Sequence, residues 1–323
     1  MQHRGAQVTA VNGSESLPVL AIGELNVDVV MTGLASTPRL GRELIASELD
    51  VTLGSATAIF ACQVRKLGHP VTFVSRVGHD SFGSLCLREL EKLGIDVSHV
   101  IRSAERGTGV TLSLPLRGER AQVTFLGAIS ELRERDLPMQ LLERQRHLHL
   151  SSFALQKGLQ PAFPSLLRRA RQLGLTTSLD PNSDLRGSLR RGILKLLPHV
   201  DVLLLNEREA RELSGKRLPA EALEVLARQV RGVVIKLGPA GAIASLDGKQ
   251  AKAKARKVSA IDTTGAGDSF AGGFVSAFLR GSALVDCLNV GNACGAASTR
   301  ALGGTAAQPT LADLPRFARE AAL

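Results

Sequence analysis

Short, strongly apolar segments alternate along this chain with longer segments in which apolar and polar residues are mixed. Residues 19–22 (VLAI) and 202–205 (VLLL) are continuous apolar runs, which indicates buried strands. Residues 57–67 and 161–173 are predicted to be helices. From residue 146 onward, strand and helix patterns repeat at the spacing of a parallel sheet with crossover helices. The chain is therefore predicted to be an α/β protein.

A second group of predicted strands is shorter and more polar. These strands are predicted at residues 42–52, 97–102, 109–116 and 121–126. We expect them to form a small antiparallel sheet apart from the main sheet. This places the small sheet within about residues 28–53 and 97–127.

Length and composition indicate a globular protein with a large core. The chain has 323 residues, of which 44% are hydrophobic. Residues 1–17 are polar and unpatterned and are predicted to be a flexible N-terminal extension. Residues 18–323 then form one domain. No apolar run approaches the ~18 residues of a membrane span, so no membrane partner is expected.

The charge of the chain is strongly basic, with 40 Lys and Arg against 30 Asp and Glu and a net charge of +10. The Arg residues are spread over many segments, aromatic residues make up 3%, and Tyr and Trp are absent. Nucleic-acid binding proteins gather basic residues and stack bases on aromatic rings. We therefore expect no nucleic-acid partner, and a basic surface that attracts a nucleotide or a sugar phosphate.

The cysteines show neither metal-ligand spacing nor the context of a small secreted protein, so we expect reduced core thiols in a cytoplasmic protein. They are Cys62, Cys86, Cys287 and Cys294. His147 and His149 alternate with leucines and are expected to serve in packing. The sequence also lacks the P-loop pattern and a G-x-G-x-x-G after the first strand, which disfavours a P-loop enzyme or a dinucleotide oxidoreductase.

The segment DTTGAGDSFAGGF at residues 262–274 has the character of an anion cradle. Gly265, Ala266 and Gly267 let the backbone approach a ligand, and a helix that begins there directs unpaired N–H groups and a positive dipole end at it. Asp268 at the mouth of the cradle suits the deprotonation of an attacking alcohol in phosphoryl transfer. The alternative is an ordinary turn with an Asp at the start of a core helix, and the local spacing leaves both open.

This segment resembles the second signature, D-T-x-G-A-G-D, of the ribokinase-like (PfkB) carbohydrate kinase family. The resemblance implies a ribokinase-like three-layer α/β/α sandwich with a mostly parallel central sheet and a small antiparallel β lid. It implies transfer of the γ-phosphoryl group of ATP to a hydroxyl of a sugar or sugar-like molecule. Asp268 would be the general base and Gly265–Gly267 the anion hole. The lid of the family often pairs with a second subunit, which implies a homodimer.

The acceptor side of the resemblance is incomplete. Of the family's first signature, G-G-x-x-x-N, Gly54 fits, Ser55 replaces the second Gly, and Ile59 replaces the substrate-binding Asn, with a one-residue shift to Ala58 left open. Ile129 similarly replaces the Asn of a family G-A-N. These changes imply a substrate that presents less hydroxyl there, or that reaches other groups.

Asn26 and Asp28 follow the first predicted strand, where ligands of open parallel sheets bind. The carboxylate of Asp28 can accept hydrogen bonds from two vicinal hydroxyls, which suits a sugar. The alternative is a surface Asp on an edge strand.

The resemblance also assigns nucleotide and metal positions. Those for ATP are Asn182, Asn206, Lys236, Gly238, Gly241, Thr264, Asn292 and Ala296. Asn206 and Glu209 would support Mg²⁺, mainly through water, although a helix cap explains them equally well. Backbone oxygens near Asp262, Thr264 and Gly303 would hold K⁺ in relatives with a monovalent cation site.

Two other functions stay open. A nucleoside kinase would share the machinery but needs a pocket for the base, against which the lack of Tyr and Trp counts. A catalytically silent sugar-binding regulator would not need Asp268 and the cradle, and their retention argues against it.

Overall fold

The computed structural model describes residues 16–116, 119–182 and 187–315, so most of the predicted N-terminal extension lies outside the described part. Nine of the described strands form the central sheet, in the order β13-β12-β11-β10-β9-β8-β1-β4-β5. They are β1 (Val19–Ile22), β4 (Val71–Gly78), β5 (Asp96–Ser103), β8 (His147–Ser151), β9 (Thr176–Asp180), β10 (Val202–Asn206), β11 (Gly232–Lys236), β12 (Ala242–Leu246) and β13 (Lys249–Ala253). All neighbours are parallel except β11–β12 and β12–β13, which confirms the mostly parallel sheet.

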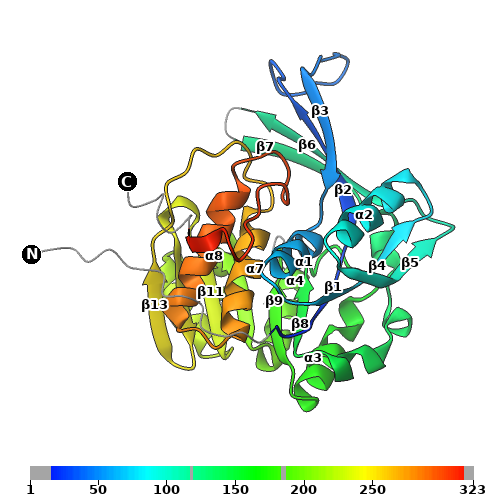
Figure 1. Ribbon diagram of the computed structural model, residues 1–323. Coiled ribbons are helices and arrows are strands. Elements are labelled where there is room, and N and C mark those ends of the chain that lie inside the picture. The colour runs from blue at the N-terminus through cyan, green and yellow to red at the C-terminus, as the bar shows by residue number, and fades with distance from the viewer. Residues whose placement is uncertain (1–15, 117–118, 183–186, 316–323) are drawn as a thin grey trace, which may run out of the picture.

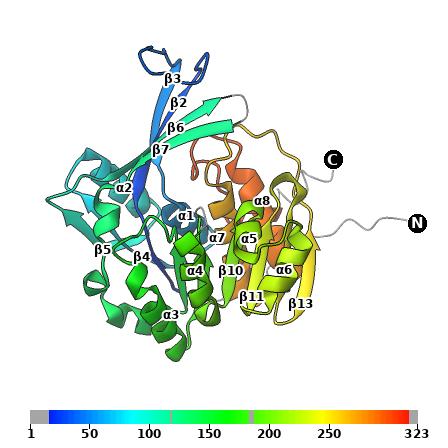
Figure 2. The same cartoon turned by 180° about the vertical axis from the view of Figure 1, so that it is seen from behind.

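Helices cover both faces of this sheet (Figures 1 and 2). One face carries α1 (Ala56–Lys66), α2 (Ser81–Lys92), α7 (Ala266–Leu279) and α8 (Leu284–Ser298). The other carries α3 (Phe163–Gln172), α4 (Gly187–Leu196), α5 (Glu207–Ser214) and α6 (Pro219–Ala227). The alternation of side chains along a strand explains the two cores, because Val19 and Ala21 pack with α1 and α7 while Leu20 and Ile22 pack with α3. The predicted three-layer sandwich is confirmed.

A four-stranded lid projects from one end of the sandwich (Figure 1). Its order is β3-β2-β6-β7, with β2 (Asn26–Thr32), β3 (Glu48–Leu53), β6 (Gly109–Leu116) and β7 (Glu119–Phe125). The β2–β3 and β6–β7 pairs are antiparallel as predicted, whereas β2 and β6 run parallel. The chain enters the lid at β2 directly after β1, so the lid lies at the end of the central sheet where β1 ends.

One predicted lid strand belongs elsewhere. The strand predicted at residues 97–102 is β5, which pairs with β4 at the edge of the central sheet. The helix α2 connects these two parallel strands, and such a β–α–β crossover returns the chain to the same sheet. The expectation for this strand was therefore wrong, while the strands predicted at residues 109–116 and 121–126 correspond to β6 and β7 of the lid.

The buried cysteines and histidines have packing roles. The four cysteines are free and buried, and desolvation raises the pKa of Cys62 to about 12. His147 Nδ1 lies 2.8 Å from Thr176 Oγ1, and His149 stacks on Phe60 with ring centroids 3.5 Å apart. Both predictions of interior roles are confirmed. Within the described ranges, no helix combines the length and the apolar character that a membrane crossing needs.

Candidate active site

The segment predicted to be the cradle is the first turn of α7. Gly265 is its N-cap, with a φ of 70°, a conformation that favours glycine. Space also requires glycine here, because a Cβ atom would lie 2.8 Å from both Gly304 Cα and Ile59 Cδ1. The close packing against Ile59 and Gly304 holds the first turn in a fixed position, and within it the Ala266 N–H donates to the Thr263 carbonyl at 3.3 Å. The local sequence therefore produces a rigid N-terminus with a positive dipole end.

Asp262 fixes the loop that precedes the cradle. Its Oδ1 accepts hydrogen bonds from the Thr264 N–H at 2.9 Å and the Thr264 hydroxyl at 2.8 Å. Its Oδ2 accepts one from the Gly303 N–H at 3.0 Å. The three residues assigned to a monovalent cation thus lie together. Thr264 and Gly303 donate hydrogen bonds to the Asp262 carboxylate, so Asp262 helps to position the loop.

Asp268, Lys236 and Asp180 form a charged cluster beside the cradle. Lys236 Nζ lies 2.6 Å from Asp180 Oδ2, and a Cβ atom at Gly267 would lie 3.4 Å from the same ammonium group. Desolvation raises the pKa of Asp268 to about 7, the charge of Asp180 acts in the same direction, and Lys236 opposes both. The cluster thus combines a proton acceptor poised near neutral pH with a fixed positive charge.

Lys236 keeps its positive charge in this cluster. Burial acts to lower the pKa of Lys236, but three neighbouring carboxylates, with Asp180 foremost, raise it above its ordinary value. The lysine side chain comes from the end of β11 and its partner Asp180 from the end of β9. Parallel strands deliver such groups to one edge of the sheet.

A polar cavity of about 200 Å³ opens on the lid side of the cradle. We name it the acceptor cavity because the predicted substrate-binding residues Asn26 and Asp28 line it. The residues singled out from the sequence that line it are Asn26, Asp28, Ser55, Ile59, Asn182, Thr264, Gly265 and Asp268. Asn182 and Thr264, which the resemblance assigns to ATP, are among the described residues that line this cavity and are not among those that line the larger cavity described below. Sequence analysis missed the others, which are Glu24, Ala56, Thr111, Gln122, Thr124, Ser152 and Leu155.

The buried pair Asn26 and Asp28 joins the lid to the acceptor cavity. Asn26 Nδ2 donates to Asp28 Oδ1 at 3.1 Å and to Thr111 Oγ1 at 3.3 Å. Thr111 in turn lies 3.2 Å from Thr124, oxygen to oxygen. Asp28 is 6% exposed, so the alternative of a surface carboxylate is wrong. Gly54 does not itself line the cavity, but a Cβ atom there would lie 2.3 Å from Asp28 Oδ1.

Glu24 is the main residue of this cavity that the sequence analysis missed. It is 2% exposed, and it accepts hydrogen bonds from the Thr57 hydroxyl and the Ser152 hydroxyl, each at 2.7 Å. A signal was available, because Glu24, Asn26 and Asp28 alternate directly after the first strand and therefore share one side. The partners of Glu24 come from distant segments and could not be anticipated.

The two isoleucines that replace asparagines of the family pattern lie in different places. Ile59 lines the acceptor cavity and packs against Gly265 and Gly304. Ile129 is buried at 2% exposure and packs close to Gly109, but it is not one of the described residues that line the cavity. Of these two replacements, Ile59 is therefore the one that changes the surface that a ligand would contact.

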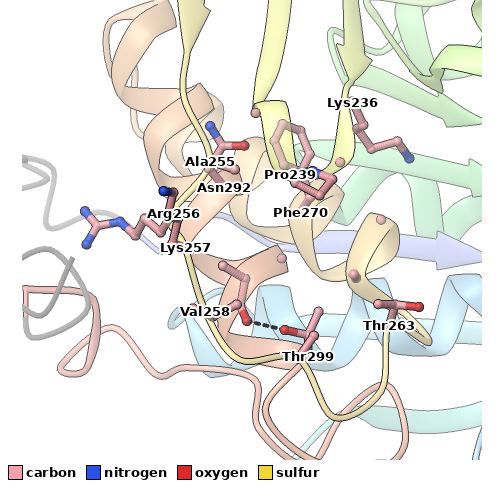
Figure 3. Close-up of a pocket in the computed structure, with 17 residues that line it drawn as sticks. Lys236, Pro239, Ala255, Arg256, Lys257, Val258, Thr263, Phe270, Asn292 and Thr299 are labelled. Atoms are coloured by element: carbon pink, nitrogen blue, oxygen red, sulfur yellow. Dashed lines mark hydrogen bonds between the residues drawn. The ribbon is translucent and has the colours of Figure 1, made fainter. Parts of the chain in front are cut away.

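A larger cavity of about 510 Å³ lies on the other side of the cradle (Figure 3). The expected residues that line it are Lys236, Gly238, Gly241, Ala266, Gly267, Asn292 and Ala296. Apolar residues that sequence analysis did not single out complete much of the wall: Pro239, Ala255, Val258, Ala260 and Phe270. Phe270 follows Ala266 by one helical turn, a spacing that could have indicated it. A cavity of this size and character suits a planar heterocycle beside charged phosphates.

Asn292 shapes this cavity through the backbone. Its Nδ2 donates to the carbonyls of Ala253 at 3.3 Å and Lys254 at 3.2 Å, which fixes the start of the loop after β13. At the end of α8, the Thr299 hydroxyl donates to the Ala296 carbonyl at 2.8 Å, as the dashed line in Figure 3 shows. Both polar side chains therefore hold wall segments in place.

Asn206 and Glu209 form a capping box at the start of α5. Asn206 Oδ1 accepts from the Glu209 N–H, and Glu209 Oε2 accepts from the Asn206 N–H, both at 2.9 Å. The linings of the two cavities, as far as they are described, do not include either residue. The charge of Glu209 nevertheless acts on Lys236 and Asp268.

Comparisons with known proteins agree on one family. Residues 17–311 match the model of the pfkB family of carbohydrate kinases. A 2-dehydro-3-deoxygluconokinase of Bacillus subtilis is 32% identical over 280 residues, which cover 82% of this chain and 86% of that protein. A ribokinase of Haemophilus influenzae is 29% identical over 314 residues, 93% of this chain and 98% of that protein. The structure of Arabidopsis thaliana ribokinase complexed with ribose and ATP has a TM-score of 0.82 at 21% identity, over 94% of this chain and 99% of that one.

Proposed function

Because this chain belongs to the pfkB family of carbohydrate kinases, we propose that it transfers the γ-phosphoryl group of ATP to a hydroxyl of a sugar or sugar-like molecule. One observation carries the proposal. Gly265 and Asp268 line the acceptor cavity, whereas Ala266 and Gly267, between them, line the larger cavity. Four consecutive residues therefore separate a site for a polar acceptor from a site for a nucleotide.

In the proposed reaction, Asp268 takes the proton of the acceptor hydroxyl as the oxygen attacks the γ-phosphorus. The bond from that phosphorus to the bridging oxygen of ADP breaks, and ADP leaves with the electron pair. The N–H groups of the cradle and the ammonium group of Lys236 stabilise the charge on the phosphoryl oxygens during transfer. Asp28 and Asn26 orient the acceptor so that its hydroxyl faces Asp268.

The charged groups near the cradle fit a magnesium ion bound mainly through water and phosphate. No group of three or more His, Cys, Asp or Glu that could form a metal cage occurs in the described part of the chain. Mg²⁺ commonly uses one or two carboxylates, several waters and substrate phosphates, and Asn206 with Glu209 could supply the protein part. When bound, the ion would neutralise charge on the β- and γ-phosphates. The assignment of K⁺ to Asp262, Thr264 and Gly303 stays a prediction.

We also propose that the protein acts as a dimer through its lid. Three large apolar side chains on lid strands are exposed: Leu49 at 56%, Val123 at 67% and Phe125 at 56%. Exposed apolar groups of this size on an open sheet support pairing with a second copy. The four free cysteines support a reducing compartment such as the cytoplasm.

The test of the proposed function is ADP release from ATP and Mg²⁺ with a panel of sugars, sugar acids, sugar phosphates and nucleosides. We expect Asp268→Asn to lower turnover by about 10²–10⁴-fold or more, because the variant cannot accept the proton, while nucleotide binding persists. Asp286→Asn is the matched control, since Asp286 occupies the first turn of α8 as Asp268 does that of α7.

Turnover of the Asp268→Asn variant close to that of the native protein would contradict the assignment of the base. Preferred turnover of nucleosides would identify a nucleoside kinase with the same machinery. ATP binding without transfer to any acceptor would instead indicate a silent regulator.

A further inference from the structure

Among the described residues that line the acceptor cavity, acidic side chains occur without a basic one. Three of its lining residues are acidic, namely Glu24, Asp28 and Asp268. Its lining, over the residues that the structure describes, contains no Lys, Arg or His. Glu24 and Asp28 are buried, so water screens their charges only partly.

The lysine of the neighbouring cavity is already engaged. Lys236 lines the larger cavity, and its ammonium group lies 2.6 Å from Asp180. The N–H groups of the cradle are required by the transferred phosphoryl group in the proposed reaction. A carboxylate or phosphate on the acceptor would therefore be buried beside carboxylates with no counter-charge from the described lining residues, which is strongly unfavourable.

The neutral polar groups of the cavity instead match hydroxyls. Asn26, Thr111 and Thr124 form a hydrogen-bonded chain along the lid, and Gln122 lines the same cavity. Amide and hydroxyl groups both donate and accept, as alcohols do. Ile59 and Leu155 provide an apolar part of the wall for carbon-bound hydrogens.

We propose that the acceptor is an uncharged polyol, and that the buried carboxylates of Glu24 and Asp28 exclude sugar acids and sugar phosphates. This inference rests on the proposed kinase function and narrows its substrate class. It separates this chain from the Bacillus subtilis relative, whose name denotes action on a sugar acid. Charge at the acceptor site, rather than overall similarity, then decides the substrate.

The test compares acceptors that differ in charge. Glucose is paired with gluconate, and 6-O-methylfructose with fructose 6-phosphate, because the methyl ether blocks the same hydroxyl without adding charge. Unmodified fructose and ribose complete the panel. We expect the neutral member of each productive pair to have a kcat/KM at least about 100-fold higher.

The Glu24→Gln variant links the preference to the proposed cause. Removal of one buried negative charge should reduce the neutral-to-anionic ratio several-fold, whereas Asp286→Asn should leave it unchanged. The ratio is measured within one preparation, so a lower folded fraction of the variant does not affect it.

The outcomes separate the two proposals. Equal or better use of the anionic member overturns the inference and leaves the kinase function standing. An unchanged ratio in Glu24→Gln overturns the role of that carboxylate. Transfer to no acceptor of either class overturns the proposed function, and the inference falls with it.

Discussion

The two cavities on either side of the cradle differ in chemistry and in origin. The larger, of about 510 Å³, is mainly apolar, whereas the smaller, of about 200 Å³, is polar and acidic. The wall of the larger cavity comes from residues 236–299, a continuous segment of about a fifth of the chain. The smaller cavity combines residues from the lid, from the end of β1, from α1 and from the cradle. In the proposed function, the groups that bind the nucleotide and the groups that contact the acceptor therefore come from separate parts of one fold.

This difference indicates where substrate specificity resides. The cradle, Lys236 and the apolar wall meet requirements that any nucleotide-dependent phosphoryl transfer imposes. The lid threonines line the acceptor cavity alone, whereas Ile59 also packs against the cradle and the charge of Glu24 also acts on Asp268. Substitutions on the two sides should consequently affect different kinetic parameters.

Among the substitutions that compare the two cavities, the largest effect is expected at the boundary between them. Gly265→Ala would place a methyl group against Ile59 and Gly304 and should displace the N–H groups of the cradle. We expect kcat to fall by about 10²–10³-fold, the loss typical when a preorganised donor is removed. Gly281→Ala is the control at the other end of α7, because Gly281 has a φ of 71° and open space around its Cα.

Both variants share the penalty of a left-handed alanine, of order 1 kcal/mol. Thermal unfolding measures this common penalty, so that the difference in kcat reports the displacement of the cradle. A similar kcat in the two variants would show that the position of the cradle is unimportant.

Two substitutions, one in each cavity, test whether the cavities bind their substrates independently. Asp28→Asn removes charge-assisted hydrogen bonds to the acceptor and should raise its KM by about 10–100-fold. Ala296→Leu narrows the larger cavity and should raise the KM for ATP by about tenfold or more. Each variant should leave the other KM within about threefold, and steady-state kinetics with both substrates varied measures all four values. Equal effects on both constants would show that the cavities act as one site.

The pKa of Asp268 predicts a smaller effect that depends on pH. Because desolvation raises this pKa to about 7, the carboxyl is protonated below that pH and cannot act as the base. We expect kcat/KM for the acceptor to fall about tenfold per pH unit below about pH 7 and to level off above it. A rate that stays constant down to pH 5 would contradict a base with a raised pKa.

The same carboxyl should affect stability in the opposite direction. Between the ordinary pKa of 3.8 and about 7, the folded protein holds a proton that the unfolded chain releases. The contribution of Asp268 to the free energy of unfolding therefore decreases as pH rises through this window. Asp268→Asn should abolish this decrease, and it should raise the melting temperature above about pH 7. Denaturant unfolding of both proteins from pH 5 to 8 measures the change.

The sequence allowed prediction of features that depend on local patterns. The segment at residues 262–274 contains both the left-handed glycine and the first turn of the helix, so it indicated the cradle without knowledge of the fold. The capping box of Asn206 and Glu209 and the interior position of His147 and His149 were likewise evident from short spacings. Each of these features depends on residues only a few positions apart.

Features that depend on distant segments were not predictable in the same way. The strand at Asp96–Ser103 resembles a lid strand in composition, and its true partner is set by the crossover through α2. Glu24 obtains its hydrogen-bond donors from residues 57 and 152, which no local pattern connects. The polar chain from Asn26 to Thr111 depends on the parallel pairing of β2 with β6, which was expected to be antiparallel.

The central claim is that one reaction joins the two cavities at Asp268. The most direct measurement follows the γ-phosphoryl group of ATP, isotopically labelled, during incubation with Mg²⁺ and a neutral polyol that supports ADP release. We predict that labelled phosphate appears on the polyol in a one-to-one ratio with ADP, and that Asp268→Asn abolishes both products together. Release of ADP with free labelled phosphate and no labelled polyol would contradict the claim.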